Sequence, residues 1–278
     1  MARVDLHCHS TASDGEFAPA VVARRAREAG LAAIALTDHD TTAGVAEAVR
    51  VGADLGVRVV CGCEFSVKAP WGELHLLGYF LDPDHVRLQE FLANTRAARR
   101  RRAEQMVTRL RQLGVGIELG QVETAANGGA LGRPHVARVL VERGVSADIG
   151  EAFDRYLGRG RPGYVEKPLP TLQQVAELVH AVGGLAVAAH LGTHGSEGQI
   201  RLFKQQGLDG LEVRHPSHPP AMEARLTRIA ERLGLAISGG SDWHGDTELG
   251  EAHAPLGGMD VPLEWLEQLE QLANSRTS

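Results

Sequence analysis

Short apolar segments alternate with amphipathic ones along the first part of the chain. Three apolar runs have the length of buried strands, and two helical patterns separate them. The runs are residues 4–9, 31–37 and 57–63, and the helical patterns are residues 18–30 and 43–55. Because strand, helix and strand follow one another in this order, we predict an α/β architecture built on a parallel sheet.

The pattern changes after the third apolar run. Residues 73–81 alternate like a further strand, but no alternation of strands and helices is visible from residue 83 to residue 163. Helical stretches take its place at residues 84–113, 134–143 and 147–157, and residues 158–163 read as a connecting loop. We predict that residues 83–163 form a helical insertion domain.

The alternation of helices and strands returns at residue 171. The expected strands are residues 185–189, 210–213 and 235–238, and the expected helices are residues 171–182, 197–206, 219–233 and 262–274. Residues 1–82 and 164–278 should therefore form one α/β domain that the insertion interrupts.

The distribution of charge singles out the insertion. The chain has a net charge of −6, which argues against a protein that coats DNA. Residues 85–165 contain 14 Arg, no Lys and 8 acidic residues, so this segment carries +6 and the remainder −12. A basic segment inside an acidic chain suggests a local anion-binding surface.

Other features of the composition indicate a soluble, cytoplasmic protein. The hydrophobic content of 43% is ample for a core. No segment approaches the roughly 20 apolar residues of a membrane span, and the N-terminus has no apolar signal region. The three cysteines, Cys8, Cys61 and Cys63, are expected to be buried in strands rather than paired.

His7 and His9 lie two residues apart on the first predicted strand. Alternate side chains of a strand share a face, so both imidazoles point the same way. Such a pair forms half of a metal site, and Asp14 in the polar loop that follows can add an oxygen ligand. Taken alone, the pair also fits a polar strand end.

Metal-capable residues also stand at the ends of later predicted strands. They are His39, Glu64, His75, His190, Asp242 and His244. Catalytic residues of a parallel α/β barrel gather at the C-terminal ends of its strands. A chance scatter of 13 histidines would not favour these positions.

Together these residues resemble the motifs of the PHP family, the polymerase-and-histidinol-phosphatase phosphoesterases. The matching segments are His7-Cys8-His9 with Asp14, Thr37-Asp38-His39-Asp40, Glu64, His75, His190 and Gly240-Ser241-Asp242-Trp243-His244. Arg133-Pro134-His135 and residues 212–218 further resemble the bacterial nucleoside 3′,5′-bisphosphate phosphatases and 5′→3′ exoribonucleases. The resemblance covers residues 1–80 and 167–278. It implies a distorted seven-stranded βα barrel with a trinuclear metal site.

The resemblance also implies how nine ligands divide among three divalent metal ions. One ion takes His7, His9, Glu64 and Asp242, a second takes Glu64, His75 and His190, and a third takes Asp14, His39 and His244. Three such ions and three carboxylates leave a charge of about +3, which suits a phosphate dianion. The mixture of nitrogen and oxygen ligands suits Mn, Fe or Zn, and we expect Mn.

The expected roles extend beyond the metals. Seven ligands are expected to act in catalysis: His7, His9, Asp14, His39, Glu64, Asp242 and His244. Five residues are expected to contact the substrate, four of them in an insertion that covers it: Arg99, Arg102, Arg133, His135 and His215. The alternatives for the arginines are a solvated helix face and a helix cap.

Several polar residues near these motifs have less definite roles. Asp38 and Asp40 either orient imidazoles or cap a helix, and Glu212 belongs either to the site or to a buried salt bridge. His218 is expected to be structural, and His253 an ordinary polar residue.

The preferred function is hydrolysis of the 3′-phosphate of nucleoside 3′,5′-bisphosphates by metal-activated water. The alternative within this family is a 5′→3′ exoribonuclease on short RNA, and the two activities can coexist. An amidohydrolase would not require Asp14, His39 and His244, and a non-catalytic metal-binding module would have lost ligands. The expected partner is a nucleotide or short-RNA substrate, without a stable nucleic-acid complex or a membrane, and the oligomeric state is left open.

Overall fold

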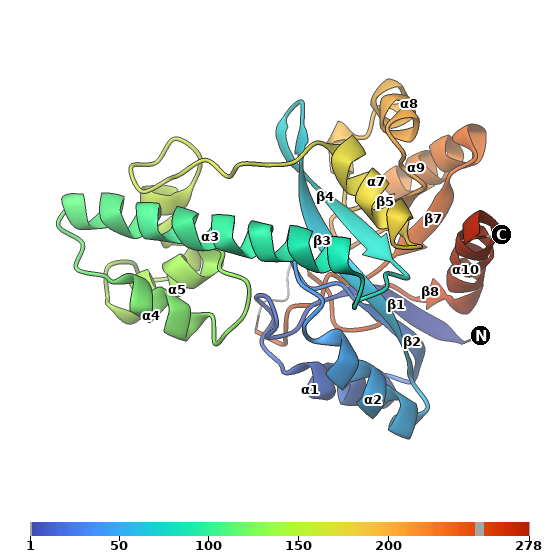
Figure 1. The fold of residues 1–278 in the computed structure, drawn as a ribbon, viewed down its shortest axis with the longest axis horizontal. Coiled ribbons are helices and arrows are strands. Elements are labelled where there is room, and N and C mark those ends of the chain that lie inside the picture. The colour runs from blue at the N-terminus through green and yellow to red at the C-terminus, as the bar shows by residue number, and fades with distance from the viewer. Residues whose placement is uncertain (1, 248–252, 278) are drawn as a thin grey trace. The chain divides into compact units, whose positions relative to one another are not determined.

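The computed structural model describes residues 2–247 and 253–277 and divides the chain into two compact units. The first unit comprises Met1–Glu90 and Leu169–Ser278, and the second comprises Phe91–Pro168. The first unit is a sheet with helices packed on it, and the second is a group of helices (Figure 1). Each unit has its own hydrophobic core.

In the part of the chain that the structure describes, the first unit contains one mixed sheet of eight strands. Their spatial order is β7, β6, β5, β4, β3, β2, β1, β8. The bounds are β1 (Arg3–Cys8), β2 (Leu31–Leu36), β3 (Arg58–Ala69), β4 (Gly72–Tyr79), β5 (Leu185–Ala188), β6 (Gly210–Arg214), β7 (Ala236–Gly239) and β8 (Val261–Pro262). Neighbouring strands are parallel, except that β4 and β8 run antiparallel to the strands they pair with.

The sheet curls until β1 approaches β7. Beyond the end of β7, the backbone N–H of His9 donates to the carbonyl of Trp243 at 2.9 Å. Gly240 lies so close to β1 that a Cβ built on it would stand 2.4 Å from the Cβ of His7. Only glycine fits this approach, which draws Asp242 and His244 toward the histidines of β1.

The α/β barrel predicted from the sequence is confirmed, with two differences in the strands. The described sheet has one strand more than the expected seven, because β8 is a two-residue pairing too short to show a hydrophobic period. The placements of Glu64 and His75 at strand ends were wrong, and His75 lies inside β4 opposite Ser66. β3 continues to Ala69 because β4 folds back and pairs with it, so Glu64 lies inside the strand opposite Leu77.

The helices of the first unit pack mainly on one face of the strands, whereas on the other face the strands pack against one another and against α10. These helices are α1 (Pro19–Glu28), α2 (Val45–Leu55), α7 (Leu172–Ala181), α8 (Glu197–Gln205), α9 (Pro220–Leu233) and α10 (Leu263–Thr277). On β2, Ala33 and Ala35 pack in the cluster that contains Leu266 of α10. Ile34 and Leu36 pack in the cluster that contains residues of α1 and α2. A strand buried on both faces is apolar at every position, which explains the continuous run at residues 31–37.

The second unit consists of helices joined by loops. It contains most of α3 (Val86–Gln112), with α4 (Leu119–Ala125), α5 (Arg133–Glu142), α6 (Ile149–Ala152) and a π-helical turn (Phe153–Leu157). Met106, Leu110 and Leu140 lie in its core. The sequence did not predict α4, a seven-residue helix that begins with a capping box between Glu118 and Gln121. That this unit covers the substrate stays a prediction.

The cysteines are free, with Cys8 and Cys63 buried and Cys61 half-buried on β1 and β3. Of the helices in residues 2–247 and 253–277, none combines the length and apolar character needed to cross a membrane.

Candidate metal centre

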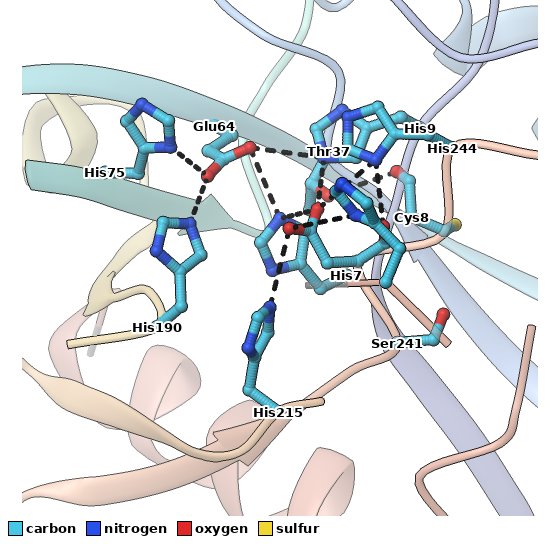
Figure 2. A network of polar contacts seen from close by, with 12 residues as sticks. His7, Cys8, His9, Thr37, Glu64, His75, His190, His215, Ser241 and His244 are labelled. Atoms are coloured by element: carbon cyan, nitrogen blue, oxygen red, sulfur yellow. Dashed lines mark hydrogen bonds and ion pairs between the residues drawn. The ribbon is translucent and has the colours of Figure 1, made fainter. Parts of the chain in front are cut away.

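The nine predicted ligands converge on one region of the first unit. His7 lies on β1 and His9 directly follows it, while Glu64 and His75 lie on β3 and β4. The other five follow strands β1, β2, β5 and β7 as Asp14, His39, His190, Asp242 and His244. Figure 2 shows imidazoles from several elements directed at the carboxylate of Glu64.

The tightest group contains His7, His9, Glu64 and Asp242, all buried. The Nε2 atom of His7 lies 3.3 Å from Oε2 of Glu64 and 3.1 Å from Oδ1 of Asp242. The Nε2 atom of His9 lies 3.2 Å from each of the same two oxygens. Four atoms with successive separations of about 3.2 Å lie about 2.0–2.3 Å from their common centre, close to the length of a metal–nitrogen or metal–oxygen bond.

The hydrogen bonding of these four residues supports the same interpretation. Within the described residues, no hydrogen bond reaches Nε2 of His7, Nε2 of His9, Oε2 of Glu64 or Oδ1 of Asp242. Buried polar atoms without hydrogen bonds are costly, and here they are the atoms that face one another. The donor set therefore fits a divalent cation.

The two carboxylate oxygens of Glu64 contact different groups of imidazoles. Oε1 lies 2.7 Å from Nδ1 of His75 and 3.1 Å from Nε2 of His190. Oε2 faces His7 and His9 and also lies 3.2 Å from Nδ1 of His39. The two oxygens of this carboxylate could therefore each face a cation.

A further group surrounds Asp14. Its Oδ1 lies 3.5 Å from Nε2 of His244, and its Oδ2 lies 3.9 Å from Nε2 of His39. His9 also faces this group, with Nδ1 3.9 Å from Oδ1 of Asp14. These residues could hold a further cation, separate from one held by His7, His9, Glu64 and Asp242.

The charges of the centre are strongly coupled. Burial alone would raise the pKa of the Glu64 carboxyl, but nearby imidazoles, His39 foremost, hold it well below its usual range. Burial lowers the pKa of His39 to about 3. For His9 and His75 burial also acts to lower the pKa, but carboxylates outweigh it and raise the values to about 10 and about 9. A cation that binds here must displace imidazole protons.

Two buried carboxylates support the ligands from behind. Glu212, fully buried on β6, has Oε1 2.9 Å from Nδ1 of His7 and accepts the backbone N–H of His190 with Oε2 at 2.7 Å. Asp38 accepts the hydroxyl of Ser10 at 2.6 Å and that of Ser13 at 2.7 Å, which fixes the loop that carries Asp14. The sequence left Glu212 open between the site and a buried salt bridge, and Asp38 open between orienting imidazoles and capping a helix, so their particular partners come from the structure.

Three other histidines lie beside the centre. His215 is buried, with Nε2 3.4 Å from Oδ2 of Asp242, so it faces a predicted ligand. His218 is structural, as expected, because its Nδ1 lies 3.0 Å from the Val213 carbonyl and its Nε2 accepts the N–H of Gly192. His253 was expected to be an ordinary polar residue. Instead its Nδ1 lies 2.7 Å from the Asp242 carbonyl, and its ring packs against His244.

The four predicted substrate residues of the insertion have contacts within the second unit. Arg99 donates to the Leu131 carbonyl at 3.2 Å, and Arg102 donates to the Val165 carbonyl at 2.8 Å. Both are buried, whereas Arg100 and Arg101 are exposed. Arg133 lies over the rings of Phe153 and Tyr164, and buried His135 accepts the N–H of Gly132 at 3.0 Å.

Comparison with known proteins shows which family and which relatives the chain resembles. The PHP domain family matches residues 5–127. The chain is 37% identical to the 3′,5′-nucleoside bisphosphate phosphatase of Chromobacterium violaceum, over 94% of this chain and 91% of that protein. It is 34% identical to a 5′-3′ exoribonuclease of Haemophilus influenzae, over 90% of this chain and 93% of that protein. A crystal structure described as a putative metal-dependent phosphoesterase of Bifidobacterium adolescentis superposes with a TM-score of 0.88 at 34% identity, covering 96% of this chain and 95% of that one.

Proposed function

The chain belongs to the PHP family of metal-dependent phosphoesterases, and from this premise we propose that it removes the 3′-phosphate of nucleoside 3′,5′-bisphosphates. Water attacks phosphorus, the bond between phosphorus and O3′ breaks, and the products are a nucleoside 5′-monophosphate and inorganic phosphate. The observation that carries the proposal is the bridging position of Glu64 between two sets of imidazoles.

We propose that the nine ligands hold three divalent ions, with Mn as the first candidate. The groups around Glu64, and around Asp14 with His39 and His244, supply the nitrogen and oxygen donors that such ions prefer. When bound, the ions supply positive charge to the phosphate and make water a stronger nucleophile at neutral pH. Glu212 accepts a hydrogen bond from Nδ1–H of His7, so that the lone pair of Nε2 points into the centre.

The insertion is our candidate for binding the second phosphate of the substrate. The net charge of +6 over residues 85–165 supports this assignment, as does the position of Arg133 in the first turn of α5. Arg99, Arg102, Arg133 and His135 are the proposed contacts there. His215 is proposed to touch the substrate at the metal centre, beside Asp242.

The second candidate function is 5′→3′ exonuclease activity on short RNA, which the similarity to the Haemophilus exoribonuclease favours. The phosphorus attacked would be equivalent, because in RNA the 3′-phosphate of the first nucleoside is esterified to the next nucleoside. Both functions therefore fit one centre.

A substrate panel tests the proposal. Chelated protein is supplied with Mn²⁺, and phosphate or nucleotide release is measured from bisphosphates, mononucleotides, short RNAs and an aryl phosphate. We expect the highest kcat/KM with a nucleoside 3′,5′-bisphosphate. A kcat/KM no higher than that for the aryl phosphate would overturn the assignment.

A further inference from the structure

A cavity of about 270 Å³ opens beside the metal centre, within the first unit. His75 and His190, which meet on Oε1 of Glu64 in Figure 2, form its inner wall. Trp71 and His194 line it together with Leu74 and Leu191. The cavity thus joins two predicted metal ligands to an aromatic and aliphatic surface.

The aromatic surface is preformed. Trp71 lies in the turn between β3 and β4, and its ring stacks on that of His194 with centroids 4.7 Å apart and planes 11° from parallel. Phe203 of α8 packs edge-on against Trp71, and the indole N–H donates to the Glu73 carbonyl at 3.1 Å. Trp71 is half-buried and His194 is exposed, so this stack has a fixed position and an accessible side.

The lining favours an uncharged flat ring over an anion. Glu73 contributes a carboxylate to the cavity, and its Oε1 lies 3.5 Å from Nε2 of His75. A phosphate placed there would meet this negative charge, whereas a base would stack on Trp71 or His194. The volume is slightly below the roughly 300–1,000 Å³ of sites for drug-sized ligands, which suits a single base.

A nucleoside 3′,5′-bisphosphate and an RNA differ in what is attached to the far side of the reacting phosphate. In a nucleoside 3′,5′-bisphosphate nothing follows the reacting phosphate, but in RNA the next nucleoside is attached to it through O5′. We propose that the cavity binds the base of the nucleoside that follows the scissile phosphate in a short RNA. The inference rests on the proposed phosphoesterase function and adds to it a site for the downstream nucleoside, which keeps the phosphate when the bond between phosphorus and O3′ breaks.

Trp71→Ala tests the site by comparing two substrates. Stacking of a base on an aromatic side chain corresponds to about a five- to 150-fold change. We expect kcat/KM for a 5′-phosphorylated dinucleotide RNA to fall by that factor, and kcat/KM for the bisphosphate to change less than twofold. Trp71→Phe should recover much of the loss because it keeps an aromatic face.

A dinucleotide whose second residue lacks its base provides the matched control. The wild-type protein should lose the same factor on this substrate, and Trp71→Ala should lose nothing further. Equal losses on dinucleotide and bisphosphate in Trp71→Ala would overturn the proposal, as would a wild-type protein that is indifferent to the missing base.

Inhibition of aryl phosphate hydrolysis by the same dinucleotide separates this inference from the proposed function. If the RNA is not cleaved, its inhibition constant should still rise in Trp71→Ala by the same factor. A bisphosphate that is not hydrolysed would remove the proposed function, whereas an inhibition constant that is unchanged in Trp71→Ala would remove the base site.

Discussion

Replacing Glu212 with glutamine should weaken metal binding without unfolding the protein. The change keeps the shape of a fully buried side chain but removes its charge. Both groups that hydrogen-bond to Glu212 are donors in the state that binds metal: Nδ1–H of His7 at 2.9 Å and the backbone N–H of His190 at 2.7 Å. A glutamine oxygen can accept from one of them, and its NH₂ group must then face the other.

Either orientation of the amide damages the centre. If NH₂ faces His7, the ring must take the other tautomer, which puts a proton on the Nε2 atom that faces Glu64 and Asp242. If the NH₂ group faces His190 instead, the backbone N–H of His190 loses its acceptor. That hydrogen bond supports a residue whose backbone has a left-handed φ of 29°. Loss of such a supporting contact typically lowers metal affinity 10–100-fold, or about 1.4–2.7 kcal/mol.

Titration of Mn²⁺ into chelated protein measures this loss, and kcat at saturating Mn²⁺ shows how much activity returns. Asp209→Asn is the matched control, because Asp209 is also buried, lies 2.7 Å from Nε2 of His180, and accepts a backbone N–H from Ala186. It should lower the melting temperature and leave Mn²⁺ affinity unchanged. Equal Mn²⁺ affinity in wild type and Glu212→Gln would refute the reasoning, as would an equal loss in the control.

Three further predictions follow from the centre and the insertion. Chelation should abolish phosphate release and Mn²⁺ should restore it, whereas Glu64→Gln should stay inactive with Mn²⁺ because an amide cannot replace a bridging carboxylate. Full activity of metal-free protein would contradict this. Arg133→Ala should lower kcat/KM for a nucleoside 3′,5′-bisphosphate about ten- to a hundredfold and spare an aryl phosphate, and equal losses would place Arg133 at the reacting phosphate or in the fold. In the metal-free protein, nearby carboxylates raise the pKa of His9 to about 10 and that of His75 to about 9, from the usual 6.5. The contribution of these two protonated imidazoles to the stability of the folded protein is therefore complete below pH 6.5 and is lost as the pH rises through 9–10. The metal-free melting temperature should therefore fall over that interval, and a flat profile would count against the coupling.

The convergence of the predicted ligands could be inferred from the sequence because parallel strands present their C-terminal ends at one edge of a sheet. His39, His190 and Asp242 each follow an apolar run, so their proximity could be inferred before the structure was seen. Glu64 was misplaced at a strand end because nothing in residues 57–63 shows that β3 continues into a hairpin.

Residues that act through tertiary contacts were harder to identify. Glu212 supports His7 across 205 positions of the sequence, and no local period encodes such a partner. His253 follows a segment without periodicity, and Trp71 lies in a hairpin turn where an aromatic residue gives no structural signal. Their positions depend on the register of β3 with β4 and on the path of the chain beyond β7.

The place at which the insertion leaves the barrel affects the entropy of closing the chain. β4 and β5 are adjacent in the sheet, yet residues 80–184 separate them, a connection of 105 residues of which 78, residues 91–168, form the second unit. Removing that unit would leave 27 residues, about a fourfold shorter loop, which changes the closure entropy by only about 1.2 kcal/mol. All nine predicted ligands lie outside residues 91–168. Insertions of very different length can therefore be exchanged at this position with little effect on the pairing of β4 with β5 and without altering any of the nine predicted ligands.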